Sequence, residues 1–145
     1  MYTYDINKKE IEKYLPNNLS EYYQTFRKAY LKLQEFIDKD DKSEISQAAI
    51  IHAYEYTFEL WWKTMQKYLE YVGTVQDYGP SATIKNAFQY NLIEDGQMWM
   101  DMLRDRNSTA HTYKEDVAND IYGRIISVHI KALKEFVEDF DNKIL

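Results

Sequence analysis

Cysteine is absent from the 145 residues, and the chain has only two prolines and four glycines. Without cysteine there can be no disulfide bond, no thiolate metal ligand and no cysteine nucleophile. The shortage of proline and glycine argues against an all-β protein, which needs many tight turns. No apolar stretch approaches the ~20 residues that a helix needs to cross a bilayer, and no apolar signal segment stands at the N-terminus. We therefore expect a cytoplasmic protein that makes no membrane contact.

The chain also lacks an excess of positive charge, since its net charge is −6. Non-specific binding to nucleic acid comes mostly from neutralised phosphates, so we expect no DNA binding and only a local, small basic site for any RNA. Fourteen tyrosines and three tryptophans are present, but aromatic residues at helical spacing indicate a core more often than a base-stacking surface. No glycine-rich phosphate loop and no histidine or carboxylate cluster at metal-ligand spacing occurs, so we predict no cofactor and no metal.

What the chain does have is apolar residues at helical spacing along most of its length. This spacing predicts helices at about residues 20–38, 43–72 and 113–143, another from Asp95 towards Arg106, and a short one opening at Gly79-Pro80-Ser81. A shorter periodic piece (Ile6, Ile11, Tyr14, Leu15) precedes Pro16, and the expected N-caps are Ser20, Ser43, Ser81 and Thr112. The predicted fold is all-α: an antiparallel up-down bundle of four main helices plus a short one, forming one domain over 1–145 with its core at about 20–143.

Two helices carry the clearest apolar rows. The 43–72 helix has a heptad-like seam with spacings of 3 and 4, formed by Ile51, Tyr54, Phe58, Trp61, Met65, Tyr68 and Val72. A second row beside it (Ala49, Ala53, Tyr56, Leu60) predicts contact with more than one neighbour. The last helix is expected to bury Val117, Ile121, Ile125, Val128 and Ala132, with a parallel row at Ile126, Ile130, Leu133, Val137 and Phe140.

The segment Arg106–Tyr113 interrupts this pattern with polar, chemically capable residues. Arg106 stands three positions after Leu103, where the apolar stripe calls for another apolar side chain, and such conflicts tend to mark functional positions. Residues 107–109 are weak helix formers, and Thr112-x-x-Glu115 matches a capping box. On one continuous helix Arg106 and His111 would point about 140° apart. We therefore predict a bend that brings His111 back towards Arg106.

Given that bend, the segment offers groups suited to phosphodiester chemistry without a metal. Arg106 is a permanent cation, His111 carries an imidazole that can accept and donate a proton, and Asn107 supplies an amide to orient them. The alternative is structural: Arg106 forms an ion pair with a nearby acid (Asp101, Asp105 or Glu115) and His111 is a capping residue. The other two histidines, His52 and His129, have no partner at ligand spacing and are expected to be interfacial or core residues.

Arg106, His111 and Tyr113 together form the motif R-x4-H-x-Y, with Asn107 directly after the arginine. This motif resembles the HEPN family, and most closely its subgroup paired with minimal nucleotidyltransferases (MNT). Further similar phrases stand at residues 54–60, 93–96 and 99–103, so the resemblance covers roughly residues 20–140. It implies a HEPN bundle that forms a homodimer and acts as the toxin of a HEPN/MNT toxin–antitoxin pair.

In that reading the protein is a metal-independent endoribonuclease, with Arg106 and His111 catalytic, Asn107 supporting them and RNA as the substrate. The cognate minimal nucleotidyltransferase is the antitoxin and transfers AMP to Tyr113, adding negative charge and bulk beside His111. Two other readings stay open. In one, the chain is a non-catalytic substrate-binding or regulatory subunit of the nucleotidyltransferase; in the other, it is a purely structural helical dimer.

Overall fold

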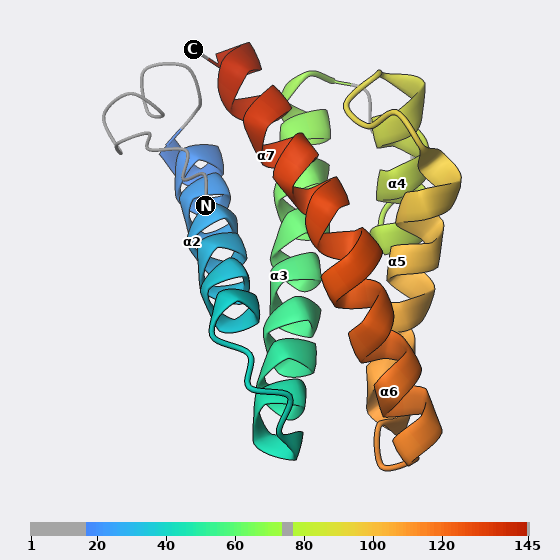
Figure 1. The fold of residues 1–145 in the computed structure, drawn as a ribbon. Helices are drawn as coiled ribbons and strands as arrows, with labels where there is room; N and C mark the ends of the chain where they lie inside the picture. The colour runs from blue at the N-terminus through green and yellow to red at the C-terminus, as the bar shows by residue number, and fades with distance from the viewer. Residues whose placement is uncertain (1–16, 74–76, 145) are drawn as a thin grey trace.

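In the computed structural model, which describes residues 17–73 and 77–144, the chain is a bundle of helices (Figure 1). Its helices are α2 Asn17–Asp38, α3 Glu44–Tyr71, α4 Pro80–Gln89, α5 Gly96–Ser108, α6 Glu115–Arg124 and α7 Ile130–Ile144. A 3₁₀ turn, Thr109–His111, follows α5, and a π-helical segment, Ile125–His129, joins α6 to α7. The predicted all-α antiparallel bundle of four main helices and a short one is confirmed.

The helix α3 lies at the centre of the bundle and contacts α2, α4, α5 and α6. Its buried face meets aromatic side chains from α5 and α7, because long apolar helices must bury their stripes against one another. Trp61 stacks on Trp99 with ring centroids 4.1 Å apart, and Phe136 packs edge-on against both. This aromatic cluster holds α3, the first turn of α5 and α7 together.

Two predicted helix starts are confirmed by their caps. The Ser43 hydroxyl accepts a hydrogen bond from the Ser46 N–H at the start of α3, and the Asp95 carboxylate accepts one from the Met98 N–H at the start of α5. Two predicted caps are wrong. Ser20 is buried inside α2, which begins three residues earlier, and Ser81 lies inside α4, whose N-cap is Gly79 with Pro80 as its first residue.

The predicted seam of α3 is buried over most of its length. Its members from Ile51 to Met65 are buried, whereas Tyr68 is partly buried and Val72 is exposed where the helix ends. In the second row Tyr56 is 54 % exposed, so that part of the predicted wide apolar face has no neighbour within the described part of the chain. The periodic piece at Ile6, Ile11, Tyr14 and Leu15 lies outside the described residues.

The last predicted helix begins at Glu115 rather than near Tyr113, and its apolar register changes in the middle. A π-helical turn contains an extra residue, which rotates the following positions around the helix axis. As a result Val128, which the sequence predicts to be buried, is 40 % exposed, and His129 is only 2 % exposed in its place. Beyond this segment Leu133 and Phe136 return to the core. None of the described helices is both long and apolar enough to cross a membrane.

Candidate functional site

The chain bends where the sequence predicts, between α5 and α6, at the end of the bundle where α3 begins (Figure 1). The α-helix ends at Ser108, and the tighter 3₁₀ turn Thr109–His111 carries the chain out of the helix direction. The predicted capping box is wrong. The Thr112 hydroxyl donates to the Thr109 carbonyl at 3.1 Å, and the N-cap of α6 is Lys114, which makes no side-chain cap. The bend and its flanks, residues 106–113, are called the corner below.

Arg106 lies on the last turn of α5 and turns towards α3. Its guanidinium forms an ion pair with the Glu59 carboxylate and donates a second hydrogen bond, of 3.2 Å, to the Asn107 side-chain oxygen. The pair is only partly exposed, 32 % for the Arg106 side chain and 26 % for Glu59, which weakens screening by water. Arg106 therefore does form an ion pair, but with an acid far away in the sequence rather than with Asp101, Asp105 or Glu115.

A second acid of α3, Glu55, holds the bend itself. The Thr109 hydroxyl lies within hydrogen-bonding distance of the Glu55 carboxylate and 2.7 Å from the Arg106 carbonyl oxygen. Because a hydroxyl has one proton, it donates to one of these acceptors at a time. Glu55 and Glu59 stand one turn apart on α3, so the two carboxylates bind the corner at two successive points.

His111 and Tyr113 lie beyond the bend on the exposed side of the corner. Their rings meet edge to face with centroids 6.0 Å apart, and Tyr113 is 77 % exposed. Arg106 is thus joined to Asn107, and His111 to Tyr113, but no hydrogen bond links the two pairs in the part of the chain that the structure describes. The exposed phenol and imidazole are open to a ligand or a second protein.

A pocket of about 530 Å³ opens beside the corner, between α3 and the start of α6. Thr109, Thr112 and Tyr113 contribute to its wall, together with Ile51, His52 and Glu55 from α3. Arg106 and His111 do not line it. Tyr113 therefore borders a hollow large enough for a small molecule, whereas Arg106 lies outside its wall and pairs with Glu59.

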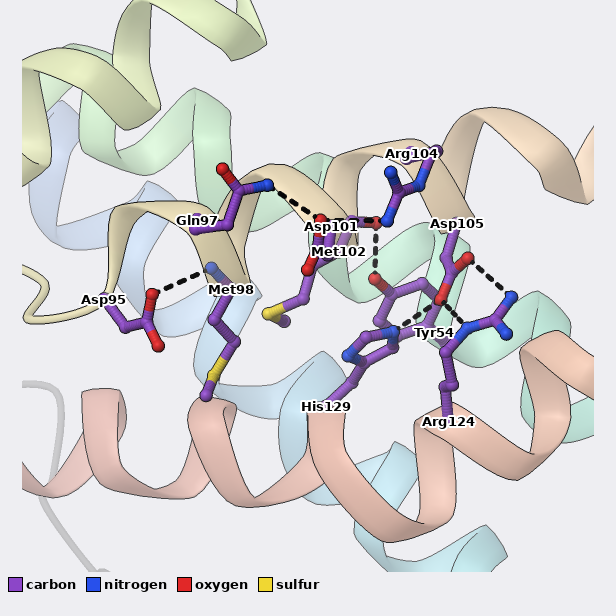
Figure 2. A network of polar contacts seen from close by, with 10 residues as sticks. All are labelled: Tyr54, Asp95, Gln97, Met98, Asp101, Met102, Arg104, Asp105, Arg124 and His129. Carbon is purple, nitrogen blue, oxygen red and sulfur yellow. Dashed lines mark hydrogen bonds and ion pairs between the residues drawn. The ribbon is translucent and has the colours of Figure 1, made fainter.

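On the other side of α5, a buried carboxylate joins this helix to α6 and to the π-helical segment (Figure 2). Asp105 is 4 % exposed and accepts hydrogen bonds from Arg124 at 2.7 and 2.9 Å and from the His129 Nε2 atom at 2.7 Å. The His129 ring stacks on Tyr54, whose hydroxyl donates to the Met102 carbonyl oxygen at 2.7 Å. We call Asp105, Arg124 and His129 the Asp105 cluster.

The carboxyl group of this cluster is held in its ionised form. Burial raises the pKa of Asp105, but the hydrogen bonds from His129 and Arg124 outweigh burial and hold its pKa below the ordinary value. An ionised carboxylate only accepts hydrogen bonds, so the His129 Nε2–H donates in this contact. The Nδ1 atom of the same ring is buried and has no hydrogen-bond partner among the described residues.

Sequence reasoning missed Glu55, Glu59 and the Asp105 cluster. One local signal was available: Asp105 stands three positions after Met102, so it interrupts the apolar stripe of α5 just as Arg106 does. The prediction that His129 is a core or interfacial residue is confirmed by its burial, whereas His52 is exposed on α3. No local pattern identifies Glu55 and Glu59, because acids on a long helix usually face water.

Comparison with known proteins identifies a matching family and a similar protein. A family model described as nucleotidyltransferase substrate binding protein like matches residues 21–142. A Haemophilus influenzae protein named probable ribonuclease HepT is 30% identical over 82 residues, which are 54% of this chain and 56% of that protein. The chain therefore spans little more than half the length of this curated relative.

Two solved structures share the fold. A protein of Thermus thermophilus has a TM-score of 0.72 and 29% identity, covering 79% of this chain and 97% of that one. A second, from Haemophilus influenzae, is described as the fold of a substrate binding domain of a nucleotidyltransferase; it has a TM-score of 0.61 and 22% identity over 85% of this chain and 96% of that one. Since the family model matches most of the chain, the protein belongs to the nucleotidyltransferase substrate binding protein like family, whose members are linked to a nucleotidyltransferase partner.

Proposed function

We propose that this protein is the RNA-cleaving toxin of a HEPN/MNT toxin–antitoxin pair, with Arg106 and His111 as its catalytic residues. The observation that supports the proposal most is the end of the α-helix at Ser108 and the 3₁₀ turn Thr109–His111, so Arg106 and His111 do not lie on one continuous straight helix. The similarity to a probable ribonuclease supports the same reaction class.

The chemistry follows from the residue types. His111 of one copy takes the proton of a ribose 2′-hydroxyl, whose oxygen attacks the adjacent phosphorus while the bond to the 5′-oxygen breaks. His111 of a second copy in a homodimer donates a proton to the leaving 5′-oxygen. Arg106 stabilises the negative charge that develops on the phosphate, and Asn107 holds the guanidinium in place through the hydrogen bond described above.

The test is RNA cleavage by purified, unmodified protein in EDTA, which removes divalent metal ions. Arg106→Ala and His111→Ala should each lower the cleavage rate by about 100-fold or more, the usual contribution of an acid–base or electrostatic group. Arg104→Ala is the matched control, because Arg104 is exposed on the same helix and pairs with Asp101 rather than with a residue of the corner. Wild-type cleavage rates in His111→Ala protein with an unchanged helical CD spectrum would overturn the catalytic assignment.

We further propose that the partner nucleotidyltransferase neutralises the toxin by transferring AMP to Tyr113. The phenol oxygen attacks the α-phosphorus of ATP, a phosphodiester to tyrosine forms and pyrophosphate leaves. The exposure of Tyr113 beside His111 supports this proposal. Intact mass after incubation with partner and ATP should rise by AMP units in the wild type and in Tyr78→Phe, whose ring is similarly exposed, but not in Tyr113→Phe. An equal gain in Tyr113→Phe would place the modification elsewhere.

A second candidate function is a non-catalytic subunit that presents a substrate to the nucleotidyltransferase. One observation favours it: in the single chain the Arg106 guanidinium is already neutralised by Glu59. This function predicts a stable complex with the partner and no RNA cleavage by the isolated protein. The EDTA assay therefore separates the two candidates directly.

A further inference from the structure

The last turn of α5 and the residue after it form ion pairs and hydrogen bonds on two sides of the helix. Towards α3, Arg106 is paired with Glu59, and Thr109 lies against Glu55. Towards α6 and the π-helical segment, Asp105 accepts three hydrogen bonds from Arg124 and His129, as Figure 2 shows. Asp105 and Arg106 are neighbours in the chain, so the contacts on both sides act on the same helical turn.

We propose that Asp105, held by His129 and Arg124, is a positioning residue that sets the direction of Arg106 and of the turn leading to His111. This inference rests on the proposed function of the corner and adds to it a residue group on the opposite side of α5. Asp105 does not face the corner and acts only through the helix that carries Arg106.

The argument starts from what a carboxylate does at this position. Met98 and Met102 precede Asp105 at helical spacing, and an apolar residue at 105 would continue that row without removing a charge from water. Apolar packing is not directional, whereas three hydrogen bonds to one carboxylate fix its position and the rotation of the helix around its axis. The buried acid therefore specifies an orientation that an apolar side chain would leave free.

The corner begins directly after Asp105 in the chain, so the orientation of this helical turn affects it. The α-helix ends at Ser108, three residues after Asp105, and the 3₁₀ turn begins at once. A small rotation of the last helical turn consequently moves both the guanidinium and the bend. Misplacement of a catalytic group by about 1 Å can lower a rate by roughly 100-fold, so an error of this kind is large enough to measure.

The π-helical segment places one of the two side chains that hold Asp105. Its extra residue brings His129 into the core, where the Nε2–H meets Asp105 and the ring stacks on Tyr54 with centroids 5.3 Å apart. In a regular α-helical register Val128 would occupy the buried row and the carboxylate would lose this donor. Irregular helical turns of this type are frequent at functional sites.

The test compares Asp105→Asn with Asp101→Asn, a partly exposed acid one turn earlier on α5 that pairs with Arg104. In Asp105→Asn the RNA cleavage kcat should fall at least about tenfold with KM nearly unchanged, because positioning affects the reacting groups more than RNA binding. Asp101→Asn should behave as the wild type. His129→Gln, which keeps an N–H donor, should lose less activity than His129→Leu.

A second readout does not depend on activity. The native-state NMR signals of the His111 ring and the Arg106 side-chain N–H should shift in Asp105→Asn and in His129→Leu, and stay in place in Asp101→Asn. A merely structural role would lower stability without moving these signals. If Asp105→Asn does not fold, Arg124→Gln, whose parent side chain is 48 % exposed, serves in its place.

The outcomes separate the two proposals. If the wild-type protein cleaves no RNA but the signals shift in Asp105→Asn, the proposed function is wrong and the positioning role of Asp105 stands. Unmoved signals in Asp105→Asn, or loss of activity to the same degree in Asp101→Asn, would overturn the positioning role even if RNA is cleaved.

Discussion

Arg106 makes two contacts through different nitrogens of one planar group, an ion pair with Glu59 and a hydrogen bond to Asn107. Lysine has a compact ammonium that cannot reproduce this fork. We predict that Arg106→Lys lowers RNA cleavage at least about tenfold despite conserving the charge, whereas Arg104→Lys has no effect. Single-turnover cleavage assays on both variants check this. Full activity in Arg106→Lys would mean that charge alone is sufficient at this position.

The ionisation of Asp105 makes stability depend on pH in a defined direction. Its pKa in the folded protein lies below the ordinary value of about 3.9, so the folded state binds this proton less tightly than the unfolded state. The stabilisation is therefore present above about pH 4 and is lost as pH falls from there through the lower folded pKa. We predict that Asp105→Asn flattens this part of the curve of unfolding midpoint against pH, and thermal melts of both proteins between pH 2 and 7 measure it.

Asp141, near the end of α7, makes stability depend on pH in the opposite direction. Burial raises the pKa of the Asp141 carboxyl, an effect that its hydrogen bonds from Tyr23 and Arg27 reduce without cancelling. The folded protein consequently binds this proton more tightly than the unfolded chain, and this group favours the folded state more as pH falls through its raised pKa. The two buried aspartates must be separated by substitution before a pH profile can be interpreted.

The starts of α3 and α4 show that a local sequence pattern predicts an N-cap in one case and not in the other. Ser43 caps α3 with its hydroxyl, whereas Ser81, which the sequence predicts as a cap, lies inside α4. We predict that Ser43→Ala lowers the free energy of unfolding by about 1 kcal/mol and that Ser81→Ala changes it by less than about 0.5 kcal/mol. Urea unfolding of the two variants measures the difference. Equal losses would contradict the observed cap positions.

At the scale of one helix, the π-helical segment has the largest consequence. The apolar rows of the last helix assume a constant helical period, and that assumption buries Val128. In the structure Val128 is exposed and His129 is buried, because Tyr54 and Asp105 on neighbouring helices offer the imidazole a ring to stack on and a carboxylate to bind. An element's register is in this case decided by its neighbours.

At the scale of the whole molecule, the proposed homodimer needs a contact surface near the corner. A groove of about 800 Å³ between α2 and α3 has Leu31, Phe36, Ala53 and the exposed Tyr56 among its lining residues. Tyr56 precedes Glu59, the partner of Arg106, by one helical turn, so a second copy on this groove would lie beside the guanidinium. For the proposed homodimer, this groove is the surface that we expect the two copies to share.

Substitution of Tyr56 tests this contact. Tyr56→Arg places an unpaired charge in the groove and should convert the proposed dimer to a monomer, with loss of RNA cleavage because each site would lose the His111 of the second copy. Tyr78→Arg is the matched control, since Tyr78 is 67 % exposed outside the groove. Sedimentation equilibrium gives the mass of each variant. A Tyr56→Arg protein that stays dimeric would exclude this groove as the contact surface.

The helices and the bend between α5 and α6 are predictable from the sequence, because apolar period and weak helix formers act within a few residues of one another. Helix starts are less predictable, since of the four expected N-caps only Ser43 is confirmed. That residues 1–145 form one domain stays a prediction, as do the roles of Arg106, Asn107, His111 and Tyr113. The residues that contact the corner and Asp105 could not be predicted in this way, because they are distant in the sequence. Asp105 meets Arg124 and His129, which are 19 and 24 residues away, and Arg106 meets Glu59 at a distance of 47 residues.

Helical spacing identifies the face of a helix on which a residue lies, but not the helix that covers that face. The neighbour depends on how all the apolar faces pack together, and this packing brought two acids of α3 to one side of the corner and a buried histidine to the other. A charged side chain in an apolar row is visible in the sequence as a conflict. Whether that conflict is resolved by water, by an ion pair or by a buried carboxylate is settled only when distant helices come into contact.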